Sequence, residues 1–139
     1  MIYDEICTYE VCKLAKDKGF PQHITEEAYI VDNYGEDDYN IGDIVPIPLM
    51  PDYMDDAAAP TQSLLQRWLR EEKGIIIDVV FDWQYNIEAE EIRYQYRIGS
   101  KRRMTIGGVQ TRGIVCGRYY DTYELALEDA LKYALENLV

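Results

Sequence analysis

Two runs of alternating side chains in the second half of the chain constrain its fold most. Apolar or aromatic residues occupy every odd position from 75 to 85 and every even position from 92 to 98. A period of two is the pattern of a strand with one buried face. The intervening residues 86–91 are few enough for a hairpin loop. The sequence therefore predicts an antiparallel hairpin, with a third strand beside it at residues 114–119.

Three segments carry helix signals. The first runs from an N-cap at Thr8 to Gly19, a residue that readily adopts the left-handed conformation at a helix end. The second starts near Pro60 or Thr61 and ends before Gly74. An apolar stripe at helical spacing supports the second helix and consists of Leu64, Leu65, Trp68 and Leu69.

The third helix covers the end of the chain. Asp121 and, three residues later, Glu124 indicate its start, because this is the spacing of a capping box. Between the first two helices, the sequence predicts two short strands, at residues 28–31 and 41–47. The element order is thus α-(β-β)-α-β-β-β-α, and the sequence predicts a single α+β domain over residues 1–139, with a three-stranded antiparallel sheet packed against helices.

Composition places this chain among ordinary globular proteins. Its 139 residues are 47% hydrophobic, which is enough to bury a core without disulfides or metal. Three cysteines, Cys7, Cys12 and Cys116, show no C-x-x-C spacing, so we expect buried thiols, no metal site and no cofactor. No apolar run has the length of a membrane helix, and the start of the chain is acidic where a signal peptide is basic. We therefore expect a cytoplasmic protein without a membrane partner.

Acidic residues are concentrated in one part of the chain. Residues 26–56, here called the acidic segment, contain ten Asp and Glu residues and no Lys or Arg, within a chain of net charge -12. One interpretation is a solvated face that maintains solubility. The other is a docking surface for a protein, and its sharper form is a mimic of DNA phosphates that occupies a DNA-binding protein. The candidate partner-binding residues are Glu36, Asp37, Asp38, Asp52, Asp55 and Asp56.

Basic residues are concentrated in another part. Residues 93–118, here called the basic segment, contain seven Lys and Arg residues and no acidic residue. Interleaved tyrosines make a groove that binds nucleic acid an alternative function. Two of these tyrosines, Tyr94 and Tyr96, share the apolar strand face and are expected in the core, and the net charge of -12 opposes the approach of a polyanion. The candidate nucleic-acid-binding residues are Arg93, Arg97, Lys101, Arg102, Arg103, Arg112 and Arg118.

No motif in the sequence indicates a named chemistry. His23 is the only histidine, and its neighbours Gln22 and Ile24 give no sign of activation. The glycines near residue 107 match neither a phosphate-binding loop nor a dinucleotide fingerprint. The sequence therefore assigns no catalytic residue and favours a non-enzymatic protein, while hydrolysis by carboxylates alone stays an open alternative.

Two short motifs carry a resemblance. They are Ala-Pro-Thr-Gln-Ser-Leu-Leu-Gln at residues 59–66 and Asp-Thr-Tyr-Glu at residues 121–124. With them the chain resembles short uncharacterised proteins of phages and mobile elements in Bacteroidetes-type bacteria. The resemblance implies a biological setting and supplies no catalytic residue. Together with the segregated charge and the 13 tyrosines, it leads us to expect an accessory protein that acts by binding an unidentified protein partner.

Overall fold

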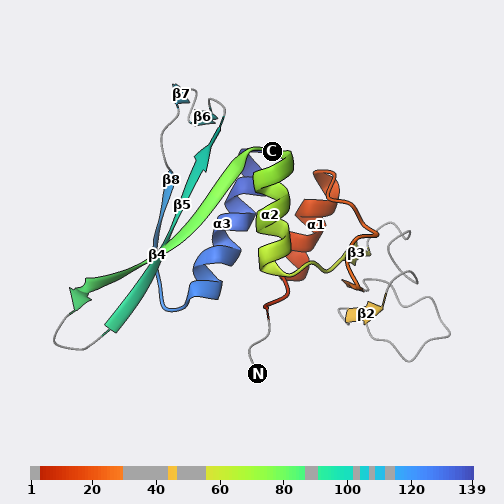
Figure 1. Ribbon diagram of the computed structural model, residues 1–139, viewed down its shortest axis with the longest axis horizontal. Helices are drawn as coiled ribbons and strands as arrows, with labels where there is room; N and C mark the ends of the chain where they lie inside the picture. Colours follow the sequence, from red (N-terminus) through yellow and green to blue (C-terminus); the bar gives the residue numbers. More distant parts are fainter. Residues whose placement is uncertain are drawn as a thin grey trace. The chain divides into compact units, whose positions relative to one another are not determined.

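The chain folds into helices and antiparallel sheets that form two compact units. The computed structural model describes residues 4–29, 44–46, 56–86, 91–101, 104–106, 109–111 and 115–139 (Figure 1). Contacts group into a first unit, Met1–Thr61, and a second unit, Gln62–Val139. The predicted α+β class is confirmed, and the element order follows the prediction closely. The single domain over residues 1–139 stays a prediction.

The first unit combines one helix with three short strands. Helix α1 covers Tyr9–Asp17, and strands β1 (Glu27–Tyr29), β2 (Ile44–Pro46) and β3 (Ala57–Ala58) form an antiparallel sheet in the order β2-β1-β3. α1 packs against β3. Strands β1 and β2 fall where two short strands were predicted, whereas β3 was not predicted because two consecutive alanines carry no alternation.

The ends of α1 follow their local sequence signals. Thr8 is extended, and its side chain accepts a hydrogen bond from the Val11 amide, as an N-cap does. Gly19 has φ 97°, a conformation that costs glycine little because it lacks a Cβ. The chain then turns back and buries Phe20 against the unit. Both predicted helix boundaries are therefore confirmed.

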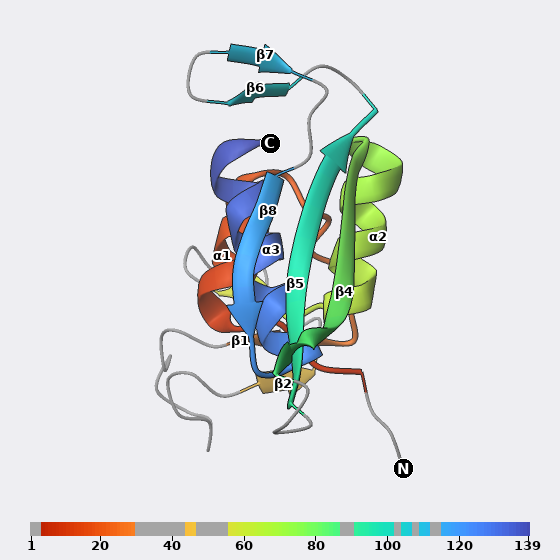
Figure 2. The same cartoon turned by 90° about the vertical axis from the view of Figure 1, so that its left-hand side faces the viewer.

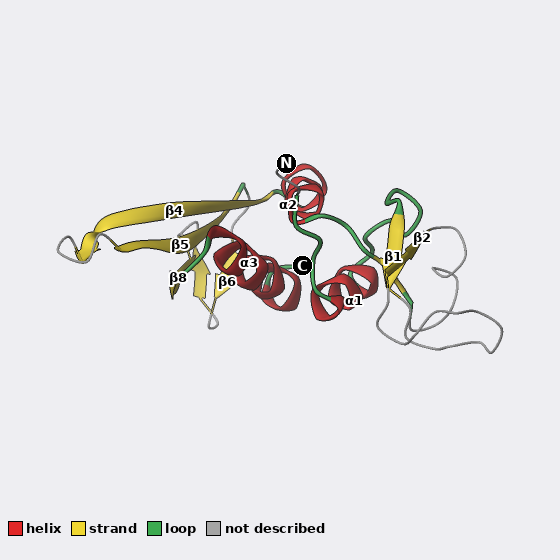
Figure 3. Cartoon of the chain, turned by 90° about the horizontal axis from the view of Figure 1, so that it is seen from below, coloured by secondary structure: helices red, strands yellow, loops and turns green. Residues whose placement is uncertain are grey.

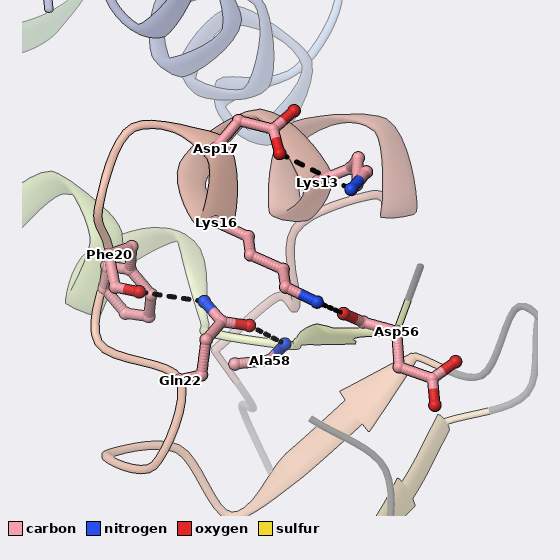
Figure 4. Close-up of polar contacts among 7 residues, drawn as sticks. All are labelled: Lys13, Lys16, Asp17, Phe20, Gln22, Asp56 and Ala58. Atoms are coloured by element: carbon pink, nitrogen blue, oxygen red, sulfur yellow. Dashed lines mark hydrogen bonds and ion pairs between the residues drawn. The ribbon is translucent and has the colours of Figure 1, made fainter. Parts of the chain in front are cut away.

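Polar contacts join α1, the loop after it and β3 (Figure 4). The Gln22 amide donates to the Phe20 carbonyl and accepts from the Ala58 amide, each at 2.8 Å. The Lys16 ammonium donates to the main-chain carbonyl of Asp56. These bonds satisfy the main-chain carbonyls of Phe20 and Asp56 and the amide of Ala58, so they help to fix the loop after α1.

The second unit contains a longer sheet and two helices. Its main elements are α2 (Gln62–Glu72), β4 (Ile75–Asn86), β5 (Glu91–Ser100), β8 (Val115–Tyr120) and α3 (Tyr123–Asn137). The strands are antiparallel in the order β4-β5-β8. The predicted hairpin, third strand and flanking helices are thus confirmed.

The core of the second unit lies between the sheet and its helices. α3 packs on all three strands, and α2 packs on β4 and α3. Figure 2 shows both helices on one side of the sheet, while no described element of this unit covers the other side, which we call the open face. On the helix side, Ile75 and Ile77 of β4 and Tyr96 and Ile98 of β5 are buried. The buried stripe of α3 consists of Ala126, Leu127, Ala130, Leu131, Ala134 and Leu135.

The start of α3 differs from the prediction. The N-cap is Thr122, whose hydroxyl accepts from the Leu125 amide at 3.1 Å, and not Asp121. Asp121 instead forms an ion pair with Arg93. The Asp121 carboxylate therefore binds Arg93 of the neighbouring strand and does not cap the helix. The adjacent Thr122 supplies the capping oxygen.

The basic segment contains two short strands that were not predicted. β6 (Met104–Ile106) and β7 (Val109–Thr111) pair as a small two-stranded antiparallel sheet. The sequence offers few clues here, because three-residue strands are too short to display a period of two.

Candidate functional site

The end of the β4–β5 hairpin extends beyond the helices that cover the rest of the sheet. β4 has 12 residues and β8 has six, so the hairpin continues past the third strand. Figure 3 shows both long strands running away from α3. The alternation that buries Ile75 and Ile77 near the start of β4 thus continues into a region that no described helix of this unit covers.

Exposed apolar side chains gather at this uncovered end. Phe81 is 56% exposed and lies opposite Tyr94 in the hairpin register. Tyr94 in turn makes an edge-on contact with Tyr123 of α3, with ring centroids 6.3 Å apart. Tyr123 is 41% exposed and Ile92, two residues before Tyr94, is 36% exposed. We call Phe81, Ile92, Tyr94 and Tyr123 the apolar cluster.

This arrangement corrects one expectation about the strands. The sequence predicts one buried face along residues 75–85, yet Phe81 on that face is largely exposed. Tyr94 and Tyr96 were both expected in the core, and only Tyr96 is buried while Tyr94 is half-buried. Alternation reports that a strand has two chemically different faces, and it does not report where the covering helix ends.

A second feature ties β8 to α3 through tyrosines. The Tyr120 hydroxyl donates to a carboxylate oxygen of Asp129 at 2.5 Å. Tyr96 lies beside Tyr120 with ring centroids 6.1 Å apart, and the Arg118 guanidinium lies over the Tyr120 ring. Burial, then the hydrogen bond to Asp129, raises the pKa of Tyr120 to about 12. The hydroxyl therefore stays protonated and acts as a structural hydrogen-bond donor.

Alkaline pH should weaken this contact. Since the pKa of Tyr120 is raised from 10.0 to about 12 in the folded protein, its stabilisation is complete below pH 10 and is lost as the pH rises through about 12. We expect the stability advantage of the wild type over Tyr120→Phe to shrink between these values. Urea denaturation of both proteins at about pH 8 and about pH 11 measures it. A difference that stays constant contradicts the role given to Tyr120.

The predicted acidic site is represented by one residue in the described part of the chain. Glu36, Asp37, Asp38, Asp52 and Asp55 lie outside the described residues. Asp56 is described, and its side chain is fully buried. Asp56 therefore does not present a carboxylate to a partner, and the docking and DNA-mimic hypotheses for the acidic segment stay predictions that rest on the other residues.

The described residues of the predicted basic site are dispersed and partly neutralised. Arg97 pairs with Asp78 at 2.9 Å, Arg93 pairs with Asp121, and Arg118 lies over Tyr120. Lys101 is exposed at the other end of β5. The remaining residues Arg102, Arg103 and Arg112 lie outside the described residues. Ion pairs on the sheet reduce the positive charge that this strand would offer to a phosphate backbone.

The sequence analysis did not predict that Lys101 lies near two further basic residues, Arg70 and Lys73. The Lys101 amide donates to the Gly74 carbonyl at 2.9 Å, so Lys101 lies next to the end of α2, where Arg70 and Lys73 are exposed. The hairpin prediction already contained this signal, because pairing residue 75 with residue 100 brings the two segments together.

The three cysteines and the histidine differ in their exposure. Cys7 and Cys12 are buried, as expected, whereas Cys116 is exposed because it lies on the open face of β8. His23 is exposed. In the described ranges, no group of three or more His, Cys, Asp or Glu side chains is arranged to hold a metal ion. Nor does any helix within those ranges have both the length and the apolar character needed to cross a membrane.

Comparisons with known proteins identify no relative. No protein family, no curated protein and no solved structure matches this chain.

Proposed function

We propose that this protein is a non-enzymatic accessory protein, of a phage or mobile element, that acts by binding a protein partner through the apolar cluster. The exposure of Phe81 at the uncovered end of the hairpin is the observation that carries this proposal. Large exposed apolar side chains that adjoin one another are favoured positions for protein interfaces, because association removes their surface from water.

The composition of the cluster supports the same function. It contains two tyrosines and a phenylalanine, and aromatic residues are enriched at the centres of interfaces because each buries a large area with few rotatable bonds. The apolar cluster thus has the kind of side chains that usually form the centre of an interface.

Nucleic-acid binding through the basic segment is the alternative. The ion pairs of Arg93 and Arg97 weigh against it. The adjacency of Lys101 to Arg70 and Lys73 at the end of α2 favours it, because cations that lie together contact phosphates, but the exposed Glu71 and Glu72 of the same turn offset this charge. A complex with a protein partner should survive nuclease treatment, whereas a complex that depends on nucleic acid should not. Nuclease treatment of the captured complex therefore distinguishes the two functions.

The experiment is an affinity capture from lysate of the native host with paired variants. Phe81 and Leu125 are matched, at 56% and 55% exposure, and Leu125 lies outside the apolar cluster on α3. We expect Phe81→Glu to lose a stoichiometric protein partner that survives nuclease, since the new carboxylate would have to be desolvated in the interface. Leu125→Glu is expected to retain that partner.

Other results would contradict the proposal. Equal capture by both variants would remove the apolar cluster as the docking surface. Partners that disappear on nuclease treatment would favour the nucleic-acid alternative. Circular dichroism of Phe81→Glu checks that the fold survives, which we expect because an exposed cross-strand pair contributes only about 0.2–1 kcal/mol.

A further inference from the structure

The open face of the second unit carries charges in a regular arrangement. β4 contributes Asp78 and Asp82, and in the hairpin register these lie directly opposite Arg97 and Arg93 of β5. One strand of this face is therefore acidic and its neighbour is basic. Between the two charged rows, Val80 lies opposite Gln95.

The charged groups of one row are accessible. Asp78 and Arg97 form an ion pair of 2.9 Å while their side chains remain 57% and 44% exposed. A guanidinium has five N–H donors and a carboxylate accepts at about four positions. The single bond from Arg97 Nη2 to Asp78 Oδ2 therefore leaves donors and acceptors on both side chains that can reach a second molecule.

Such a face is complementary to itself. A two-fold axis along the strands, midway between β4 and β5, would place β4 of one copy over β5 of the other. Asp78 of each copy then faces Arg97 of the other copy, and Asp82 faces Arg93 in the same way. Every contact occurs twice in a two-fold interface, so the four charges of the Asp78–Arg97 row would form a closed network. Charge networks contribute more than isolated surface pairs.

The rest of the open face is compatible with contact between two sheets. Ile76 and Tyr119 expose 41% and 40% of their side chains, and both can be buried between copies. Facing sheets lie about 10 Å apart, a gap that an arginine and an aspartate together can span. The net charge of -12 opposes association, yet at physiological salt the Debye length is about 8 Å, so contacting pairs are screened much less than distant charges.

We propose that a second copy of this chain binds the open face and forms a two-fold dimer held chiefly by the Asp78–Arg97 row. The Asp82–Arg93 row contributes less, because Arg93 already pairs with Asp121 and Asp82 already accepts a hydrogen bond from the Tyr119 hydroxyl at 3.2 Å. This surface is on the opposite side of the sheet from the buried residues Ile77 and Ile98, and it involves no residue of the apolar cluster. The dimer and the proposed protein-binding function can therefore fail independently.

A charge exchange tests the proposal at physiological salt. Analytical ultracentrifugation of the full chain is expected to show a dimer. In the Asp78→Arg variant, the new arginine of each copy would face Arg97 of the other copy. This repulsion occurs at two places in the dimer and should raise the dimer dissociation constant at least about tenfold. The double variant Asp78→Arg with Arg97→Asp restores the pair within each copy and between identical copies, so it should dimerise like the wild type.

Mixing experiments give the most discriminating result. When the double variant is mixed with mass-tagged wild type, like charges meet in the Asp78–Arg97 row, and native mass spectrometry should show heterodimers well below their statistical proportion. Tagged and untagged wild type serve as the control and should mix statistically. A monomeric wild type, an unchanged dissociation constant in a folded Asp78→Arg variant, or statistical mixing with the double variant would each overturn the proposal. If Asp78→Arg alone fails to fold, the double variant still decides.

Discussion

Leu131→Ala is expected to lower the free energy of unfolding by about 2–5 kcal/mol, the range for truncating a buried leucine in a packed core. Leu131 lies on the stripe of α3 that covers the sheet, and its side chain is fully buried. The loss combines the transfer free energy of the removed methyl groups with the cost of the cavity left behind. Since helix and sheet both line that space, it has little freedom to collapse.

Leu125→Ala is the matched control for this substitution. It changes the same residue type on the same helix, but Leu125 is 55% exposed. We expect a change within about 0.5 kcal/mol, as for most surface positions. Urea denaturation at neutral pH measures both variants. A similar loss at the two positions would contradict the orientation of α3 described above.

Gly117→Ala is the second substitution for which we expect a large effect. A Cβ at this position of β8 would lie 2.2 Å from Tyr96 Cε1 and 2.6 Å from two further ring atoms. The register shows why the approach is so close: Gln95 pairs with Tyr119 and Arg97 with Cys116, so Gly117 and Arg118 together face Tyr96. In this bulge, the tyrosine ring occupies the space that a side chain at 117 would need.

Relief of this clash requires movement in a buried region. Tyr96 is only 7% exposed and packs beside Tyr120, so its ring cannot swing into solvent without loss of core contacts. Overpacking of this kind costs about 1–3 kcal/mol. Gly117→Ala should therefore lower the melting temperature by several degrees in a thermal scan, since each kcal/mol corresponds to roughly 2–8 °C for domains of this size range.

Gly99→Ala provides the control for the glycine substitution. It also lies in a strand of the same sheet, but a Cβ there meets nothing within 4 Å. We expect stability to be unchanged or to rise by up to about 1 kcal/mol, because alanine restricts the unfolded chain. Combining Gly117→Ala with Tyr96→Leu should cost less than the sum of the two single changes. Strict additivity would show that Tyr96 is not the obstacle.

Local signals in the sequence predicted most elements of the fold. The N-cap at Thr8, the end of α1 at Gly19 and the stripe of α2 depend on residues within one or two turns of each other. The hairpin was predictable because both strands show a clear period of two and their loop is short. The α+β class followed from the order of these elements.

Candidate sites were much less predictable than the fold. Charge density along the chain suggested an acidic and a basic segment. Asp56 of the acidic segment is buried, however. Arg93 and Arg97 of the basic segment pair with Asp121 and Asp78, which lie outside both segments. The apolar cluster combines a hairpin end with the start of α3, and Phe81 looked like a core residue in the strand pattern. These residues gain their roles from neighbours that are distant in sequence.

The positions of the helices and strands, and the apolar face of each strand, can be read from the sequence because they depend on side-chain size and spacing over a few residues. Tertiary packing sets how far α3 extends over the sheet, which glycine must remain small beneath Tyr96, and which charges meet across β4 and β5. Exposure and pairing depend on the relative lengths and registers of packed elements, and no local pattern encodes these quantities.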